Sequence, residues 1–128
     1  MRPVPLASLT LLVLSTVTAL AEGRPFDGRW GWTAEDCALQ PGDSDLVPIE
    51  IGNDEMHYYE SHCRLDAVEP VGGEATAAWR VTRTCMGEGE TWSDEVLLAL
   101  EYGADERRRQ LIEIGLGDGS VTVRQACD

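Results

Sequence analysis

Acidic side chains gather around a tryptophan in the second half of the chain, at a spacing that could attract a cation or a basic partner. The residues concerned are Glu88, Glu90, Trp92, Asp94 and Glu95. Carboxylates attract positive charge, and an indole is a typical anchor at the centre of a binding surface. The cluster is therefore a candidate binding rim for a basic protein or a glycan, with an ordinary solvated hairpin as the alternative explanation.

Two other groups of side chains resemble parts of metal sites. His57 and His62 are the only histidines, and on one continuous strand their odd separation would place them on opposite faces, where they could not share an ion. The Asp-Ser-Asp stretch at 43–45 carries the first ligands of a calcium loop but lacks the later ones. A turn explains that stretch, so the sequence predicts no metal site and no cofactor.

The carboxylates do not by themselves indicate catalysis. A pair of acids for glycoside hydrolysis can be drawn from any chain with 23 acidic residues. The sequence contains no Ser-His-Asp order typical of a triad, no glycine-rich phosphate loop and no His-Glu-x-x-His zinc motif. We therefore predict that the protein is not an enzyme.

The first 21 residues have the pattern of an export signal. Arg2 supplies a positive start, an apolar run follows over 6–20, and an Ala-Leu-Ala cleavage site ends the segment. Cleavage would leave one domain over 22–128, without a membrane span. The ten basic residues are all arginine, which suggests a GC-rich coding bias and a bacterial periplasm as the location.

The chain is strongly acidic. Its formal net charge is −13, and loss of Arg2 with the signal would make it −14. Such a charge repels nucleic acid and anionic lipid, so neither is expected as a partner. A basic protein or a glycan fits better, although an acidic surface that only keeps the protein soluble is also consistent with this composition.

Four cysteines in an exported chain predict two disulfides. A zinc site would need paired cysteines at close spacing, which this sequence lacks. If strands alternate in direction, Cys37 and Cys127 fall at the same end, which slightly favours pairing Cys37 with Cys127 and Cys63 with Cys85. The sequential pairing, Cys37 with Cys63 and Cys85 with Cys127, stays open because a disulfide between adjacent strands needs an unusually short Cβ separation.

Alternating apolar residues and frequent glycine turns predict an all-β fold, a small up-and-down antiparallel β-barrel of about seven to eight strands. The one helical signal lies near 33–38, where Thr33 and Asp36 could cap a single turn. The expected strands cover 26–32, 46–52, 56–69, 75–86, 91–102, 108–116 and 119–126. The expected turns are Gly52-Asn53-Asp54, Gly72-Gly73, Gly87-Glu88-Gly89, Gly103-Ala104-Asp105 and Gly117-Asp118-Gly119. An arginine triplet at 107–109 would guard the start of a strand against strand addition.

Odd positions on the two central strands are mostly apolar, so we expect them to face the interior. Arg83 is the exception among them. The inward set comprises Tyr59, Ser61, Cys63, Leu65, Ala67, Trp79, Val81 and Cys85.

The opening of the predicted domain holds Phe26, Trp30 and Trp32, three of the eight aromatic residues. Gly28-x-Trp30, together with Arg124 near the end, resembles the G-x-W motif and terminal arginine of the calycin families, which include lipocalins and avidins. In that family the arginine packs over the tryptophan and seals the floor of the barrel. The resemblance implies that Trp30 and Arg124 form a structural plug.

Two further resemblances concern exported proteins. The order of Gly, Trp and Cys along the mature chain, from Gly28 to Cys127, is similar to uncharacterised small periplasmic four-cysteine β proteins of Gram-negative bacteria, which implies a compartment but no activity. A cystine that joins the first and last strands is similar to the periplasmic inhibitors of C-type lysozyme, although their Ser-Gly-x-x-Tyr loop has no clear counterpart here.

These features predict a non-enzymatic periplasmic protein that binds a protein, a glycan or a small molecule. One alternative is an inhibitor of a basic hydrolase such as C-type lysozyme. The other is a structural accessory of an envelope complex. The interior of the barrel would distinguish these ligands. A lined cavity would favour a small molecule, whereas a core filled with side chains would favour recognition at the outer surface.

Overall fold

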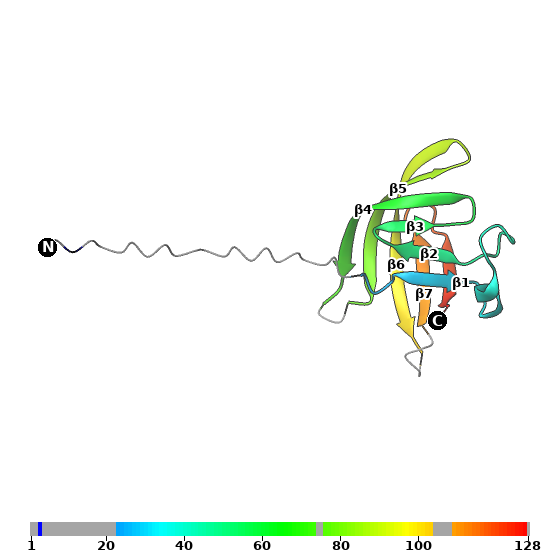
Figure 1. Cartoon of the computed structure of the whole chain (residues 1–128), viewed down its shortest axis with the longest axis horizontal. Coiled ribbons are helices and arrows are strands. Elements are labelled where there is room, and N and C mark those ends of the chain that lie inside the picture. The colour runs from blue at the N-terminus through cyan, green and yellow to red at the C-terminus, as the bar shows by residue number, and fades with distance from the viewer. Residues whose placement is uncertain (1–2, 4–22, 74–75, 104–108, 128) are drawn as a thin grey trace.

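The structure, a computed structural model, describes residue 3 and residues 23–73, 76–103 and 109–127 (Figure 1). The predicted export signal, apart from residue 3, lies outside the described residues. So do the expected strand start at residue 75, the Ala104-Asp105 turn and the first two arginines of the 107–109 triplet. Among the residues that the structure describes, none forms a helix that is both long and apolar enough to span a bilayer.

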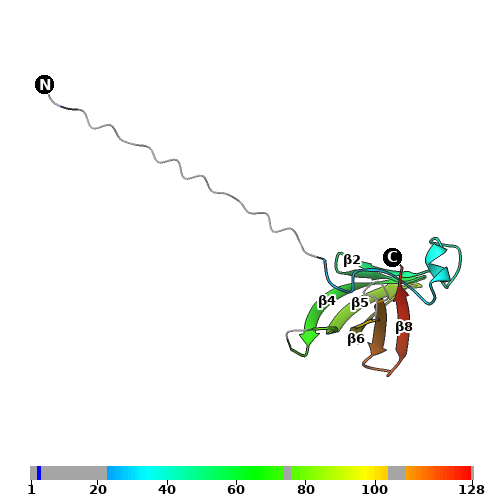
Figure 2. The same ribbon diagram turned by 90° about the horizontal axis from the view of Figure 1, so that it is seen from below.

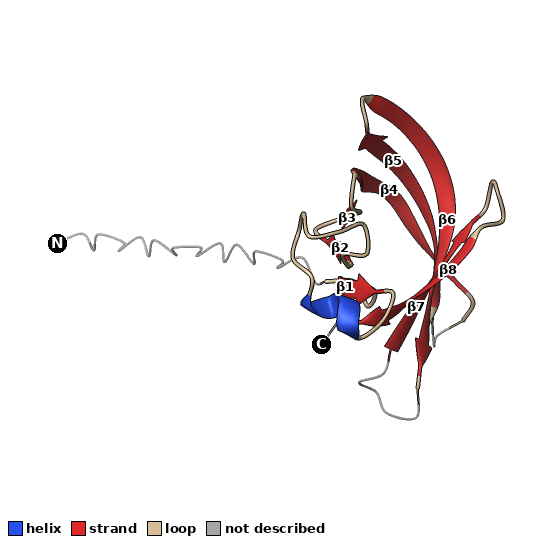
Figure 3. Ribbon diagram, turned by 90° about the vertical axis from the view of Figure 1, so that its right-hand side faces the viewer, coloured by secondary structure: helices blue, strands red, loops and turns tan. Residues whose placement is uncertain are grey.

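The described chain forms a closed eight-stranded antiparallel barrel, which confirms the all-β prediction. Each strand pairs with the next along the chain, and the last returns to pair with the first (Figures 1 and 3). The elements are β1 (Gly28–Gly31), η1 (Glu35–Ala38, a 3-10 helix), β2 (Ile49–Gly52), β3 (Glu55–His57), β4 (Ser61–Val71), β5 (Ala78–Gly87), β6 (Glu90–Tyr102), β7 (Arg109–Gly115) and β8 (Val121–Ala126). Seen from below, β4, β5, β6 and β8 curve around a common interior (Figure 2).

The two ends of the barrel can be named by their turns. The rim end carries the β3–β4, β5–β6 and β7–β8 connections, and the plug end carries the β2–β3 and β4–β5 connections. At two predicted turns the backbone adopts positive φ, with Asn53 and Asp54 at 53° and 58° and Glu88 and Gly89 at 50° and 77°. Such angles match the type I′ turns that join twisted hairpin strands.

The single strand predicted over 56–69 is wrong, because β3 ends at His57 and β4 begins at Ser61. The intervening turn is closed by a 2.8 Å hydrogen bond from the amide of Tyr58 to the carbonyl of Ser61. Residues 58–60 are Tyr-Tyr-Glu, which carry none of the glycine, proline or asparagine signals that mark a turn in sequence.

The predicted inward face is correct for most positions and wrong for two. Tyr59 lies in the turn between β3 and β4 and is exposed. Cys63 and Leu65 are buried on β4, but Ala67 is exposed. The β4–β5 register shifts between Leu65 and Ala67, so the alternation of faces changes there and Val68 packs against the core instead. A β-bulge of this kind inverts the parity of every later residue on its strand.

Aromatic residues fill the plug end. The rings of Phe26 and Trp79 meet edge to face with their centroids 5.1 Å apart. The indole N–H of Trp30 donates a 2.9 Å hydrogen bond to the carbonyl of Phe26, and Trp30 is 1% exposed. Aliphatic and sulfur side chains continue the filled core: Ile49, Ile51, Met56, Cys63, Leu65, Val81, Cys85, Val96, Leu98, Leu100 and Leu111.

The cation next to Trp30 is not the predicted one. The guanidinium carbon of Arg109 lies 5.5 Å from the centroid of Trp30, whereas that of Arg124 lies 4.5 Å from the centroid of Trp32. The β1–β8 register explains the difference, because it places Arg124 one position beyond the paired residues, beside Trp32. The expected packing of Arg124 over Trp30 is therefore corrected to a packing over Trp32.

The two disulfides join Cys37 to Cys127 and Cys63 to Cys85, with Cα–Cα distances of 5.4 Å and 3.9 Å. This is the nested connectivity, but the strand-direction argument that favoured it is wrong, because β1 and β8 run antiparallel. Cys37 reaches Cys127 because the chain folds back after β1, where the guanidinium of Arg29 donates to the Cys37 carbonyl at 3.4 Å.

The predicted helical turn is present as η1. The amide of Thr33 donates to the carboxylate of Asp36 at 3.1 Å, and the amide of Asp36 donates to the hydroxyl of Thr33 at 3.3 Å. These reciprocal bonds satisfy the amides that a short helix leaves without partners.

Reduction of the folded protein should open Cys37–Cys127 before Cys63–Cys85. Cys37 and Cys127 are partly exposed, while Cys63 and Cys85 are at most 1% exposed inside the wall, and thiol exchange requires access of the attacking thiolate. Alkylation of freed thiols after graded reduction, followed by peptide mass spectrometry, measures the order. Loss of both disulfides together before any unfolding would contradict this expectation.

Candidate functional site

Several carboxylates that take part in none of the ion pairs among the described residues lie at the rim end. Glu60 from the β3–β4 turn lies near Glu88 and Glu90 from the β5–β6 hairpin. Together with Trp92 they line a shallow pocket with a volume of about 270 Å³. We call these four residues the acidic rim. The hairpin that carries three of them projects from the body of the barrel at the top of Figure 1.

Two carboxyl groups of the acidic rim are in direct contact. Glu60 and Glu88 are close enough to share a hydrogen bond, which raises the pKa of Glu60, and repulsion from the Glu88 charge raises it further. Asp45 adds a smaller repulsive contribution. None of the ion pairs among the described residues involves Glu60, Glu88 or Glu90. A cation placed there would therefore relieve repulsion that the folded chain leaves uncompensated.

A glycine allows the two turns of the rim to approach. A Cβ atom at Gly87 would lie 2.7 Å from the Cβ of Ser61 and 2.8 Å from the carbonyl oxygen of Glu60. Gly87 and Ser61 are directly paired in the β4–β5 register. The close contact of the backbones brings Glu60 and Glu88 together although they lie far apart in sequence.

Trp92 stands at the inner edge of the rim. It pairs with Cys85 in the β5–β6 register, on the face that points into the barrel further along the strand. Trp92 is nevertheless 40% exposed, since no strand covers it at this height. An indole that is half covered by its own wall and half open to solvent can anchor a partner with little loss of side-chain freedom.

Two members of the predicted rim lie elsewhere. Asp94 points into the barrel and binds Arg83, and Glu95 lies on the outer face and binds Arg80 at 2.6 Å. Alternation along β6 separates them from each other, and their cationic partners on β5 lie directly or diagonally opposite. Of the sequence prediction, Glu88, Glu90 and Trp92 come together, and Glu60 is the member that sequence reasoning missed.

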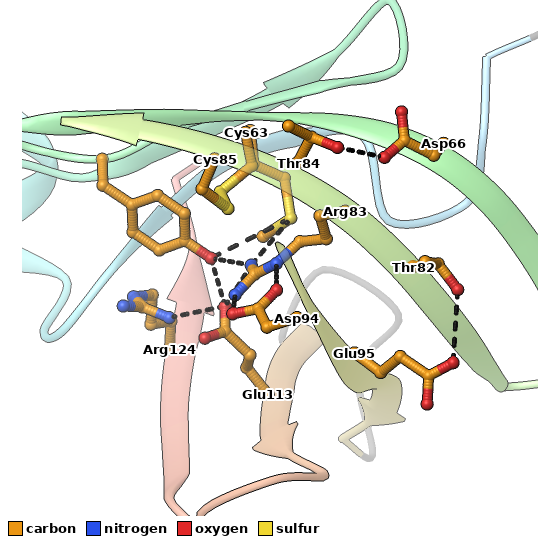
Figure 4. A network of polar contacts seen from close by, with 12 residues as sticks. Cys63, Asp66, Thr82, Arg83, Thr84, Cys85, Asp94, Glu95, Glu113 and Arg124 are labelled. Atoms are coloured by element: carbon orange, nitrogen blue, oxygen red, sulfur yellow. Dashed lines mark hydrogen bonds and ion pairs between the residues drawn. A yellow bond between two sulfur atoms is a disulfide. The ribbon is translucent and has the colours of Figure 1, made fainter. Parts of the chain in front are cut away.

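A polar cluster occupies the interior below the rim (Figure 4). Arg83 is 6% exposed, and its Nε and Nη2 atoms donate to the two carboxylate oxygens of Asp94 at 2.7 Å and 2.9 Å. Its Nη1 donates to the hydroxyl of Tyr58 at 2.6 Å, and that hydroxyl donates to Glu113 at 2.6 Å. Arg124 completes the cluster, with its Nη1 atom 3.7 Å from Glu113.

The pKa shifts in this cluster describe a charged but compensated interior. Burial and the neighbouring charge of Glu113 raise the pKa of Tyr58, so its hydroxyl stays protonated. Burial lowers the pKa of Arg83, but the hydrogen bonds to Asp94 and the charges around it outweigh that effect and raise the pKa overall. Two arginines face two carboxylates, and every guanidinium nitrogen of Arg83 has a partner. The charges of the cluster are therefore largely compensated within the fold, and Arg83, Asp94 and Glu113 also line a pocket of about 340 Å³.

The sequence carried one signal for this cluster. Arg83 is the polar exception on an otherwise apolar inward face, and such an exception indicates a buried ion pair. Its partners could not be named in advance, because Tyr58 follows an unpredicted break between strands and Glu113 lies on a different hairpin.

The histidine prediction is wrong in its geometry. His57 and His62 lie directly opposite each other in the β3–β4 register and stack with ring centroids 6.0 Å apart. The turn at 58–60 restores a common face to residues that one unbroken strand would separate. Within the described ranges, no three side chains of the His, Cys, Asp and Glu types gather as a metal cluster.

The Asp-Ser-Asp stretch forms a turn, as predicted. The carboxylate of Asp43 accepts a 2.7 Å hydrogen bond from the amide of Gln40, and the amide of Asp43 donates to the Gln40 carbonyl at 3.0 Å. These bonds use the carboxylate locally.

Searches against protein-family models, curated proteins and solved structures returned no significant match to this chain.

The Arg83–Asp94 pair should contribute through compensation of a buried charge. We expect Asp94→Asn to lower the free energy of unfolding by about 1 to 3 kcal/mol, because it leaves the guanidinium without its counter-charge. Replacing both partners, Arg83→Met with Asp94→Asn, should cost less than the sum of the single changes. Chemical denaturation of the four proteins measures the coupling, and strictly additive effects would show that the pair is energetically irrelevant.

Tyr58 should make stability fall at high pH. Its pKa is raised from the usual 10.0 on folding, so the protonated phenol stabilises the fold fully below that value and the contribution is lost as the pH rises above it. We expect the unfolding free energy to decline more steeply above pH 10 in the native sequence than in Tyr58→Phe. Parallel slopes in denaturant titrations across this range would contradict the assignment.

Proposed function

We propose that this protein is a non-enzymatic binding protein of the periplasm, which holds a basic protein partner at its acidic rim. The observation that carries the proposal is the contact between the carboxyl groups of Glu60 and Glu88 beside the exposed ring of Trp92. Like charges held together where the β5–β6 hairpin meets the β3–β4 turn repel each other in the free protein, and a bound cation would relieve this repulsion.

The packed hydrophobic core and the compensated charges below the rim support recognition at the surface. Phe26, Trp30 and Trp79 close the plug end, and the Arg83 cluster occupies the space below the rim. A lipocalin-like cup for a small ligand needs a mostly apolar cavity in that volume, whereas the pocket of about 340 Å³ there is lined mainly by charged and polar groups, among them Arg83, Asp94 and Glu113. The concave surface at the acidic rim instead suits the tip of a side chain, such as a lysine or arginine of a partner protein.

The compartment is part of the same proposal. Two disulfides form within one small domain, and structural disulfides are typical of oxidising compartments such as the periplasm. The apolar leader in the sequence and the acidic composition are consistent with export to a compartment outside the cytoplasm.

A basic hydrolase such as C-type lysozyme is a second, more specific candidate for the partner. The observation in its favour is the projection of the β5–β6 hairpin, with Glu88 at positive φ at its tip (Figure 1). An acidic hairpin of this shape could enter a cationic cleft and block it. A role as a structural accessory of an envelope complex uses the same surface without inhibition.

The binding proposal predicts a charge-dependent complex that needs the acidic rim. In biolayer interferometry against immobilised C-type lysozyme and cytochrome c, a basic protein that is no hydrolase, we expect binding that weakens with added salt. The double change Glu60→Gln with Glu88→Gln should weaken it by about tenfold or more, and Trp92→Ala should do the same, in the range of interface hot spots. Affinity should also fall with acidification through the raised pKa of Glu60, since protonation removes the charge that the partner binds.

Glu101→Gln is the matched control, because it removes an exposed carboxylate from the opposite end of β6. Because this variant removes one charge and the rim variant removes two, a loss of half as much binding free energy or more would mean that only net charge matters and would refute a defined rim. A bacterial lysis assay then distinguishes an inhibitor from a binding protein without inhibitory activity. Loss of lysozyme activity supports the inhibitor, and binding without loss of activity excludes it.

A further inference from the structure

The outer wall of the barrel carries a row of side chains that neither the interior nor the proposed binding function uses. His57 of β3 lies opposite His62 of β4, and His62 lies opposite Met86 of β5. The residues that alternate with them, including Cys63 and Cys85, are buried. The two imidazoles and the thioether therefore share the solvent-facing side of three adjacent strands.

The two imidazoles are already close and aligned. Their ring planes differ by 19°, with a centroid separation of 6.0 Å. The Nε2 atom of His57 lies 3.1 Å from the carboxylate of Glu55, an arrangement in which an outer carboxylate orients a metal-binding imidazole. A direct cross-strand pair of this kind needs only side-chain rotation to present two nitrogen ligands to one ion.

Met86 is exposed in a way that packing does not explain. It is 47% exposed, whereas Met56, which is adjacent in register to the same β4 strand, is 0% exposed and belongs to the core. A methionine side chain has three rotatable bonds and a polarisable sulfur. From its place beside His62, the thioether can lean over the imidazole pair.

The surroundings favour a cation. His57, His62 and Met86 line a shallow, open pocket with a volume of about 650 Å³. Glu60 and Glu90 line the same pocket. Nearby carboxylates attract a positive ion and do not need to coordinate it. Among the residues that line this pocket, Met86 supplies the one soft sulfur ligand beside the two imidazoles.

We propose that His57, His62 and Met86 form a binding site for a cuprous ion on the outer face of β3, β4 and β5. Thioether sulfur selects soft Cu(I), imidazole nitrogen binds copper and zinc alike, and oxygen-preferring ions such as Mg²⁺ and Ca²⁺ gain nothing from either ligand. The combination of two nitrogens and one sulfur therefore assigns Cu(I) over Zn²⁺. The four cysteines are held in disulfides and do not compete as ligands.

The test is a competition for Cu(I) between the exported, tag-free protein and bicinchoninate under nitrogen, with Cu(I) supplied as its acetonitrile complex so that no reductant reaches the disulfides. We expect one Cu(I) per chain. Met86→Leu preserves size and should lower the Cu(I) affinity by about tenfold or more, while leaving Zn²⁺ affinity unchanged, because only Cu(I) uses the thioether. His62→Asn should weaken both ions.

Thr91→Ala is the matched control, since Thr91 is the next residue of the same row after Met86 and offers no soft ligand. X-ray absorption should detect one sulfur neighbour of copper in the native protein and in Thr91→Ala, and none in Met86→Leu. Absence of stoichiometric Cu(I) binding, or native affinity in Met86→Leu, would overturn the proposal. Changes at Met86 leave Glu88 and Trp92 intact, so this result is independent of the rim-binding experiment.

Discussion

Closure of the barrel depends on its smallest strand pairing. β1 and β8 meet through only two residue pairs, Trp30 with Ala126 and Gly31 with Gln125, and so few backbone hydrogen bonds would leave a separable seam. The Cys37–Cys127 disulfide spans this seam, and it fits there because a Cβ at Gly31 would come within about 3.3 Å of both sulfur atoms. A cross-link between residues 90 positions apart removes much of the freedom of the open chain. The packing of the interior, the geometry of the acidic rim and the arrangement of the outer wall all depend on closure of the barrel.

Much of the fold follows from local patterns in the sequence. Alternating apolar residues predicted the sheet, and the Gly52-Asn53-Asp54 and Gly87-Glu88-Gly89 segments predicted hairpins that the positive φ values confirm. The break between β3 and β4 escaped prediction because its residues carry no turn signal, although a backbone hydrogen bond from Tyr58 to Ser61 closes the turn. The shift after Leu65 escaped as well, because a bulge is one extra residue whose position depends on the neighbouring strand. The argument from strand direction placed Cys37 and Cys127 at the same end of a seven-stranded barrel. It failed because the structure has eight strands, so the first and last run antiparallel.

Only part of the acidic rim could be predicted, because one of its members depends on strand register. Glu88, Glu90 and Trp92 follow one another on one hairpin, so proximity along the chain was enough to group them. Glu60 joins them only through the β4–β5 register, which no local pattern specifies. Asp94 shares the inward face of Trp92 but lies further along β6, directly opposite Arg83, and a buried guanidinium requires a carboxylate as its counter-charge. His57 and His62 show the same dependence, since one unpredicted turn converts opposite faces into a shared one.

Gly87 connects these observations. Its missing side chain lets the backbone of β5 touch the turn that carries Glu60, so the separation of the two repelling acids is governed by a residue without any functional group. A single methyl at this position would wedge the two loops apart while every charge stayed in place. The affinity that we propose for a cationic partner at the acidic rim would thus depend on steric clearance at Gly87 as much as on the number of carboxylates.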